Sequence, residues 1–226
     1  MLLKWSAIWS TSVTRMNNLT FPLIALSRLR MATDGDGITT LIAGAGCPLD
    51  CKWCLNAKLL RDGLVTPVTP QELYDRVKID DLYFRASGGG VTFGGGESLL
   101  HAPFIQAFRS VCNDQWRIYA ETSLHVPREN VVIAAQVIDE YIVDIKDLNP
   151  EIYHSYTGGD VALARQNLEY LLSCVGPDRI TVRIPLIPEF NTSEDQAKTL
   201  DKLTAMGITK TDVFPYIIKE PQGGNQ

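Results

Sequence analysis

The sequence predicts an α/β protein, a partial (β/α)6 TIM-like barrel with mostly parallel strands. Six short runs of β-branched and aromatic residues alternate with segments in which apolar residues recur at helical spacing. This alternation is typical of βα units, whose right-handed crossovers roll a parallel sheet in one direction. Because six units are fewer than the eight of a closed barrel, we expect an open barrel with a wide mouth.

The expected elements follow one another from residue 38 onward. The segment 34–37, Asp-Gly-Asp-Gly, marks a turn before the first strand, and the segment 69–72, Thr-Pro-Gln-Glu, has the capping residue, proline and acidic first turn of a helix N-terminus. Strands are expected at 38–43, 91–93, 116–120, 141–145, 180–187 and 213–218. Helices are expected at 70–78, 102–111, 130–138, 161–172 and 194–206.

Length and composition indicate one globular domain. The 226 residues are 45% hydrophobic and 21% charged, which is ordinary for a folded protein. Residues 1–33 are weakly patterned and are expected to form an N-terminal extension. Residues 34–226 are expected to form the core domain.

Charge and cysteine usage exclude several classes of protein. The net charge of −5 creates no overall basic field for nucleic acid or an anionic membrane. No apolar run approaches the ~20 residues that span a bilayer. In the N-terminal segment, polar residues interrupt every apolar run before it reaches the length of the apolar core of a signal peptide. Three of the five cysteines crowd into one loop, unlike a secreted disulfide framework. We therefore expect a cytoplasmic monomer that binds neither nucleic acid nor membranes.

The crowded cysteines directly follow the first expected strand. Cys47, Cys51 and Cys54 have the spacing C-x3-C-x2-C, which lets one short loop turn three sulfur atoms toward one point. Four thiolates would complete a structural zinc site or a [4Fe–4S] cluster, whereas three leave one iron of a cluster open to a small molecule. A zinc site with a distant fourth ligand and unligated thiols remain alternatives.

Polar or glycine-rich residues occur at the ends of the later strands, where barrel active sites are built. They are the Gly-Gly-Gly-Glu segment 94–97, Glu121 and Thr122, Asp144 and Lys146, and Arg183. Glycines let a backbone approach a ligand closely, although a simple turn would also explain them.

Asp144 and Lys146 alternate with the apolar Val143 and Ile145, so both charged side chains should project from one face of their strand. A lone buried charge is unfavourable, so the two should pair with each other or with a charged ligand. A purely structural ion pair is the alternative.

Taken together, these motifs resemble those of the radical S-adenosylmethionine (radical SAM) superfamily. Its cluster loop is C-x3-C-x-aromatic-C, and Trp53 stands at the aromatic position. From about residue 34 to residue 216, the glycine-rich segment 87–97, the pair Glu121-Thr122 and the segment 143–146 are similar to the glycyl-radical-enzyme activases, the family of the pyruvate formate-lyase activating enzyme.

The resemblance implies an oxidoreductase with a [4Fe–4S] cluster on Cys47, Cys51 and Cys54, whose open iron binds SAM. The reduced cluster would cleave SAM to a 5′-deoxyadenosyl radical, which would install a glycyl radical on a partner enzyme such as pyruvate formate-lyase. A flavodoxin or ferredoxin would supply the electron. No side chain beyond the cluster and SAM would be catalytic.

The resemblance also implies a set of cofactor-binding residues. The backbone of the Gly-Gly-Glu motif would bind the amino group of SAM, the Asp-x-Lys motif would contact SAM, and residues around the third cysteine would touch adenine. A monovalent cation would lie near Glu121 and Thr122. The full set is Trp53, Cys54, Leu55, Gly95, Gly96, Glu97, Glu121, Thr122, Asp144, Lys146 and Arg183.

The sequence departs from the family pattern at three points. Segment 34–39 lacks the proline and arginine of D-G-P-G-x-R, Glu121 stands where related enzymes have Asp, and no histidine occurs near Tyr216 where the family often has one. Two alternatives therefore stay open. One is a radical SAM enzyme that modifies a small molecule, RNA or another protein, and the other is a non-enzymatic zinc or redox module.

The remaining cysteines and histidines are expected to be structural. Cys112 and Cys174 lie in helical patterns and are expected to be buried as small hydrophobic residues. His101, His125 and His154 have no metal-ligand spacing and are expected at the surface or as helix caps. No second C-x2-C occurs, so one cluster is expected.

Overall fold

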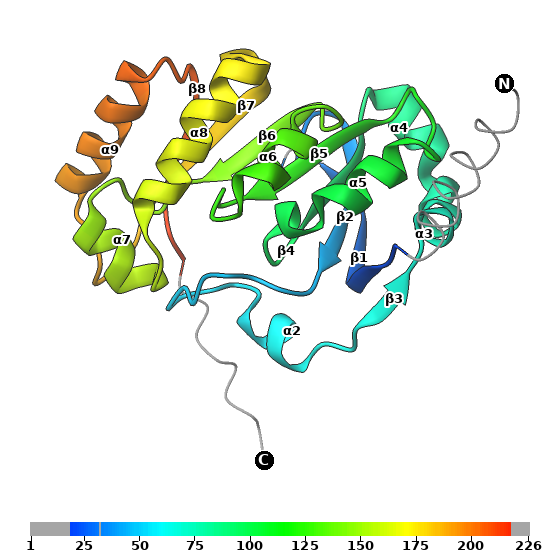
Figure 1. Ribbon diagram of the computed structural model, residues 1–226, viewed down its shortest axis with the longest axis horizontal. Coiled ribbons are helices and arrows are strands. Elements are labelled where there is room, and N and C mark those ends of the chain that lie inside the picture. The colour runs from blue at the N-terminus through cyan, green and yellow to red at the C-terminus, as the bar shows by residue number, and fades with distance from the viewer. Residues whose placement is uncertain (1–18, 32, 218–226) are drawn as a thin grey trace, which may run out of the picture.

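One eight-stranded sheet, ordered β3-β1-β2-β4-β5-β6-β7-β8, forms the frame of the computed structural model, which describes residues 19–31 and 33–217 (Figure 1). From β2 to β8 along this order, each strand is parallel to its neighbour. These strands are β2 (Ile38–Gly44), β4 (Gly90–Gly95), β5 (Arg117–Thr122), β6 (Glu140–Asp144), β7 (Ile180–Leu186) and β8 (Lys210–Pro215). The expected six-stranded, mostly parallel α/β architecture is confirmed.

Two antiparallel strands that the sequence analysis missed extend the sheet beyond β2. Strand β1 (Phe21–Met31) pairs with β2, and β3 (Thr66–Val68) pairs with β1. Strand β1 lies within the expected N-terminal extension, so its residues belong to the sheet instead. Its register with β2 shifts twice, and these irregularities break the alternation of apolar residues that identifies a strand in sequence. The expectation for residues 1–18 lies outside the described residues.

The five expected helices are present, and three short ones are additional. They are α2 (Ala57–Asp62), α3 (Pro70–Val77), α4 (Asp81–Ser87), α5 (Ala102–Arg109), α6 (Arg128–Ala134), α7 (Pro150–Thr157), α8 (Val161–Val175) and α9 (Ser193–Ala205), with 3-10 turns η1 (Lys78–Asp80), η2 (Ser98–His101) and η3 (Pro177–Arg179). The unexpected helices α2, α4 and α7 have 6, 7 and 8 residues. The expected start of α3 is confirmed, because Thr69 and Glu72 form a capping box.

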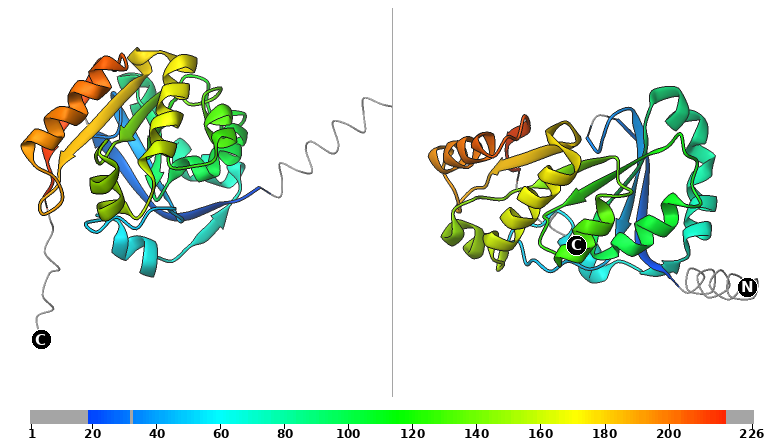
Figure 2. Two further views of the ribbon diagram at one scale, coloured as in Figure 1. Left: turned by 60° about the vertical axis from the view of Figure 1, so that its left-hand side comes forward. Right: turned by 45° about the horizontal axis from the view of Figure 1, so that its top comes forward.

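Successive side chains on each parallel strand serve two different surfaces. Ile42, Phe93, Val143 and Val182 are fully buried in the hydrophobic core beneath the helices, and the ring of Phe93 packs edge-on against Phe108 of α5 at a centroid distance of 5.6 Å. In Figures 1 and 2, helices α5, α6 and α8 cross in front of the sheet. Since alternate side chains point to opposite faces, the residues between them face the concave side.

No helix within the described ranges combines the length and apolarity needed to cross a membrane.

Candidate active site

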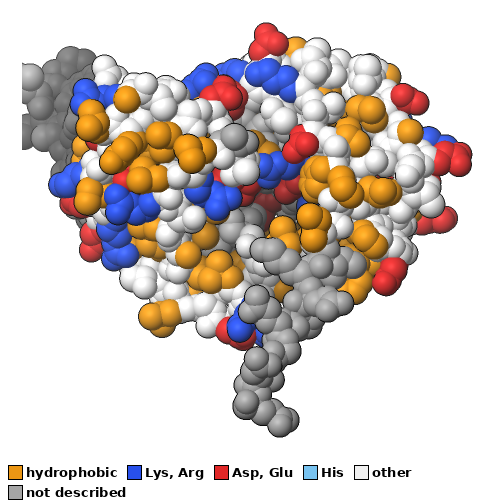
Figure 3. Space-filling model, turned by 180° about the vertical axis from the view of Figure 1, so that it is seen from behind, with side chains coloured by type: hydrophobic (Ala, Val, Ile, Leu, Met, Phe, Trp, Pro, Cys, Tyr) orange, Lys and Arg blue, Asp and Glu red, His pale blue; other side chains and the backbone are white. Residues whose placement is uncertain are grey.

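A cavity of about 650 Å³ lies at the carboxyl ends of the parallel strands, on the concave side of the sheet. Figure 3, which shows the side away from the viewer in Figure 1, has acidic and basic side chains gathered around a central hollow. The volume lies in the range of cofactor and small-molecule sites. The predicted site residues that line the cavity are Cys47, Cys51, Cys54, Leu55, Gly95, Gly96, Glu97, Glu121, Thr122, Asp144, Lys146 and Arg183. Every predicted residue except Trp53 is therefore found there.

The cysteine loop, residues 45–56, is anchored on the end of helix α7. The backbone N–H of Asp50 donates to the carbonyl of Thr157 at 2.8 Å, and that of Lys52 donates to the carbonyl of Tyr156 at 3.0 Å. The last carbonyls of a helix lack partners within the helix, so they are available to a neighbouring loop. The three thiols are thus presented to the cavity by a loop that the protein itself holds in place.

The donor set of this loop fits an iron–sulfur cluster. Cys47, Cys51 and Cys54 line one cavity, and thiolates are the ligands that iron–sulfur clusters require. In residues 19–31 and 33–217, no three His, Cys, Asp or Glu side chains converge closely enough to hold a single metal ion. In a [4Fe–4S] cubane each thiolate binds a different iron, so the sulfur atoms need not meet at one point. The three thiols of this loop are therefore a donor set that would fit a [4Fe–4S] cluster.

Burial keeps the thiol of Cys51 protonated in the metal-free protein. Removal from water raises the pKa of Cys51 to about 11, while the nearby Lys146 ammonium opposes the rise. Because a metal ligand must be a thiolate, cluster assembly has to displace this proton.

The glycine segment after β4 packs against the backbone at the start of the cysteine loop. The N–H of Gly96 donates to the carbonyl of Gly44 at 3.0 Å, and the N–H of Glu97 donates to the carbonyl of Gly46 at 2.8 Å. A Cβ on Gly96 would lie 2.1 Å from the carbonyl oxygen of Gly46, which no side chain can do. These glycines therefore position the cysteine loop as well as facing the cavity.

Asn56 strengthens this contact, and the sequence analysis missed it. Its side-chain amide donates to the carbonyl of Gly95 at 2.7 Å, and the residue lines the cavity. A single asparagine after a cysteine motif forms no pattern, so no sequence signal could have identified it.

The carboxylate of Glu97 is engaged within the protein. Glu97 is 2% exposed, and its oxygens accept from the N–H of Leu99 at 3.0 Å, the hydroxyl of Thr122 at 2.5 Å, and the N–H and hydroxyl of Ser123 at 2.8 and 2.6 Å. This side chain ties the end of β4 to the end of β5. The backbone of the Gly-Gly-Glu motif is then the part that a ligand could use.

Asp144 and Lys146 face the cavity together, as their alternation with buried Val143 and Ile145 predicts. The ammonium of Lys146 lies 3.6 Å from a carboxylate oxygen of Asp144. Burial works against the charge of Lys146, but Asp144 together with the neighbouring Cys51 and Tyr216 raises the pKa of the ammonium. The pair therefore offers one positive and one negative group at neutral pH.

Two arginines supply the other positive charges of the cavity. Arg183 of β7 donates to Glu121 of β5 at 2.8 Å, and Arg30 of β1 forms an ion pair with Asp34, which is 2% exposed. Arg30 and Asp34 are not among the predicted site residues. Arg30 reaches the cavity only because β1 joins the sheet, a strand that the sequence analysis missed.

The aromatic residues near the cysteine loop differ from the expectation. Trp53 does not line the cavity, and its indole N–H is buried without a hydrogen-bond partner among the described residues. Its carbonyl accepts from the hydroxyl of Tyr216, so β8 is tied to the loop. Tyr216 and Tyr156 both line the cavity.

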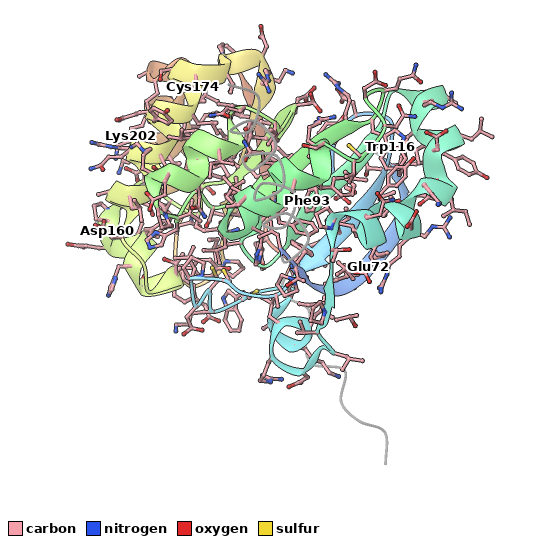
Figure 4. All side chains as sticks on the ribbon, turned by 45° about the vertical axis from the view of Figure 1, so that its right-hand side comes forward. Glu72, Phe93, Trp116, Asp160, Cys174 and Lys202 are labelled. Carbon is pink, nitrogen blue, oxygen red and sulfur yellow. The ribbon has the colours of Figure 1, made fainter. Side chains whose placement is uncertain are left out.

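The expectation that Cys174 is buried is wrong, and Cys112 is only partly buried. His101 stands at the N-cap position of α5, although its side chain caps no backbone N–H there, and His125 is partly buried. Cys174 is exposed on α8 rather than buried, and Figure 4 shows it at the outer side of the molecule. His101 is half-buried, with its ring 4.9 Å from that of Phe21 and a nitrogen 3.0 Å from the carbonyl of Ala45. Helical spacing alone does not distinguish the inner from the outer side of α8. His154 is exposed on α7, as expected.

Comparison with known proteins identifies the family. A model of the radical SAM superfamily matches residues 41–203. This chain belongs to the radical SAM superfamily. Its curated relatives include pyruvate formate-lyase 2-activating enzyme of Escherichia coli K12, which is 29% identical over 216 residues, covering 81% of this chain and 73% of that protein.

A second relative of this radical SAM chain is pyruvate formate-lyase-activating enzyme of Listeria monocytogenes. It is 30% identical over 198 residues, covering 81% of this chain and 77% of that protein. Among solved structures, SuiB of Streptococcus suis has a TM-score of 0.61 and 16% identity, covering 98% of this chain and 45% of SuiB, which is a likeness in fold. The sequence relatives place this radical SAM chain among the glycyl-radical-enzyme activating enzymes.

Proposed function

We propose that this chain activates a glycyl radical enzyme. When bound, a [4Fe–4S] cluster and SAM supply one chemistry, the one-electron cleavage of the sulfonium into methionine and a 5′-deoxyadenosyl radical. That radical would take the α-hydrogen of a glycine in the partner enzyme, leaving 5′-deoxyadenosine and a glycyl radical. Reduced flavodoxin or ferredoxin would provide the electron.

One observation carries the proposal. The three cysteines, the Gly-Gly-Glu backbone and the Asp144–Lys146 pair line a single cavity, although they come from three separate parts of the sequence, at the ends of β2, β4 and β6. Activating enzymes of the same superfamily are the sequence relatives of this chain. No other arrangement of chemistry-bearing residues in the described chain unites so many of its motifs.

Different residues of the cavity would bind the cluster, the methionine part of SAM and the adenine. Cys47, Cys51 and Cys54 would hold the cluster, and Asp144 and Lys146 would complement the ammonium and carboxylate of the methionine part of SAM. Cys54 and Leu55 would touch the adenine, with Trp53 contributing only through its backbone. These side chains bind and orient, and no proton has to move in the reaction.

The shape of the sheet suits a protein segment as substrate. Strands β3 and β8 form opposite edges of the described sheet, so the sheet does not close on itself. The cavity at its carboxyl end is correspondingly open toward solvent. A loop of a partner protein could therefore approach a cofactor bound there, and a seated loop would exclude water from the radical.

Production of 5′-deoxyadenosine tests the first half of the proposal. The anaerobically reconstituted protein is incubated with dithionite and SAM, and the nucleoside is quantified by chromatography. We expect production by the wild type and by Cys174→Ala, whose cysteine is exposed and remote from the cavity, and none by Cys51→Ala. Equal production by the wild type and Cys51→Ala would refute the cluster assignment.

A glycyl radical on a partner tests the second half. The reduced holoenzyme and SAM are mixed with a glycyl radical enzyme encoded beside this chain, and the radical is detected by electron paramagnetic resonance. We expect one radical signal that is lost when the target glycine is replaced by alanine. Formation of 5′-deoxyadenosine without any protein radical would assign the chain to a different substrate.

A further inference from the structure

The positive charge next to Glu121 is supplied by the chain itself. The guanidinium of Arg183 donates to a carboxylate oxygen of Glu121 at 2.8 Å, and the two side chains are only 20% and 21% exposed. The register of the sheet places Arg183 of β7 beside Asp144 of β6 on one side and Asp212 of β8 on the other. Arg183 is also 3.9 Å from the carboxylate of Asp212. Arg183 is thus a partly buried cation that stands among three acidic side chains, of which Asp144 also pairs with Lys146.

The other oxygen of the Glu121 carboxylate lies close to the backbone of Gly94, which has no side chain. A Cβ on Gly94 would lie 2.7 Å from this oxygen, so the glycine is what makes room for it. A glutamate is one methylene longer than the aspartate of the family pattern that this segment resembles. The added length carries the carboxylate across Gly94 to Arg183.

The hydroxyl of Thr122 and the backbone carbonyl of Glu121 are engaged as well. The hydroxyl of Thr122 donates to Glu97 at 2.5 Å and accepts from the N–H of Leu124 at 2.9 Å. The carbonyl of Glu121 accepts from the hydroxyl of Ser98 at 2.7 Å. A potassium or sodium ion needs several oxygen ligands, and any ion here would also meet the like charge of the guanidinium. The residues present therefore do not fit the monovalent cation that the family resemblance implies at Glu121 and Thr122.

We infer that Arg183 replaces that cation, so that this chain binds SAM without a requirement for potassium or sodium ions. The inference rests on the proposed function. Arg183 acts as a positioning residue, because it keeps a fixed positive charge beside Glu121 and Asp144 where a dissociable ion would otherwise be needed. Salt composition then has no specific effect on the site.

The test compares SAM binding in two salts. The dissociation constant of SAM is measured on the reconstituted holoenzyme by anaerobic equilibrium dialysis, in potassium chloride and in choline chloride at equal ionic strength. For the wild type we expect values within about twofold of each other, since only general screening remains. In Arg183→Ala the freed Glu121 can take up an ion, so SAM should bind about tenfold more tightly in potassium than in choline.

Matched variants make the result specific. Arg183→Lys keeps a positive charge and should remain insensitive to the choice of salt. Arg165→Ala removes an arginine that is 58% exposed and pairs with Glu169 on the outside of α8, and it should behave as the wild type. Thallium(I), a spectroscopic substitute for potassium, should show no bound ion in the wild-type complex with SAM and one in Arg183→Ala.

Each outcome decides between the alternatives. If the wild type loses SAM affinity in choline, or binds one thallium ion, the inference is wrong while the proposed function stands. If SAM binds in neither salt, both are wrong. Should Arg183→Ala fail to fold, the wild type in the two salts and the thallium count still give the answer.

Discussion

The acidic side chains that line the cavity differ in how firmly their partners hold them. Asp212 is 55% exposed and lies 3.9 Å from Arg183. The four others are less exposed and pair as Asp34 with Arg30, Glu97 with Thr122 and Ser123, Glu121 with Arg183, and Asp144 with Lys146. The last contact, at 3.6 Å, is too long for a hydrogen bond, whereas Arg183 reaches Glu121 at 2.8 Å. Of these four pairs, Asp144 and Lys146 therefore lose the least interaction energy when each binds a charged ligand instead of the other.

Asp144→Asn tests this assignment at the scale of one residue. The substitution removes the negative charge that would meet the ammonium of SAM, and we expect SAM affinity to fall by about tenfold to a hundredfold. Equilibrium dialysis on the reconstituted protein measures it. Asp50→Asn is the matched control, because Asp50 pairs with Lys52 but is 89% exposed and should leave SAM affinity unchanged. Equal affinities for all three proteins would remove Asp144 from the site.

Gly96→Ala tests the close approach of two backbones. A methyl group on residue 96 would lie 2.1 Å from the carbonyl oxygen of Gly46, so the cysteine loop would have to move. We expect less iron per chain after anaerobic reconstitution and a lower midpoint of thermal unfolding. The control is Gly207→Ala, where φ is +94° but no atom lies within 4 Å, so stability falls slightly and iron content does not. Full iron loading of Gly96→Ala would contradict the positioning role.

At the scale of elements, the site is assembled by connections between the ends of neighbouring strands. Glu97 joins the end of β4 to the end of β5, the final carbonyls of α7 hold the cysteine loop, and Tyr216 joins the end of β8 to the same loop. The connection from α7 uses carbonyls that the end of a helix leaves without partners, whereas the other two rely on the side chains of Glu97 and Tyr216. The carboxyl edge of the sheet is therefore stabilised by the residues that shape the cavity.

Glu97→Gln tests the most heavily used of these connections. The carboxylate accepts from four donors, whereas an amide would turn an N–H₂ group toward some of them. We expect the free energy of unfolding, measured by urea denaturation of the metal-free protein, to fall by about 2 to 3 kcal/mol. Glu72→Gln in the exposed capping box of α3 is the comparison and should lower it by about 1 kcal/mol or less. A loss no larger for Glu97→Gln than for Glu72→Gln would refute the role of this link.

At the scale of the whole molecule, one sheet separates a dry core from a charged cavity. The faces toward the helices carry side chains such as Phe93 and Val182 that are fully buried. The faces toward the cavity carry Glu121, Asp144 and Arg183. The core between sheet and helices supplies the stability, so the charged face can serve binding.

The buried tyrosines of the core predict how stability depends on pH. Tyr141 is 1% exposed, its hydroxyl has no hydrogen-bond partner among the described residues, and burial raises its pKa above the usual value of about 10. A raised pKa in the folded state means that the unfolded chain loses its proton first, so stability falls as pH rises above about 10.

Tyr141→Phe removes both the unpartnered hydroxyl and this titration. We expect the variant to equal or exceed the wild type in stability at neutral pH, by up to about 1 kcal/mol, and to lose less above pH ~10. Urea unfolding at both pH values measures the difference. Tyr83→Phe, at a 47% exposed position, should follow the wild type. A wild type and Tyr141→Phe that lose stability equally at high pH would show that Tyr141 titrates normally.

Short-range patterns in the sequence determined the order of the parallel strands, the thiol triad and the shared face of Asp144 and Lys146. Each of these depends on a spacing of a few residues, such as the two-residue repeat of a strand, and such spacings survive in any context that permits the element. Strand β1 has two register shifts that break such a repeat, so it escaped prediction.

Only the tertiary structure decided which charged groups meet in the cavity. Arg183 and Glu121 are 62 positions apart, and Arg30 enters the site through a strand that pairs antiparallel to β2. The register between strands, which sets these pairings, is determined by packing of the whole sheet against its helices rather than by any local sequence. For that reason the family resemblance implied a monovalent cation beside Glu121, whereas the folded chain places an arginine there.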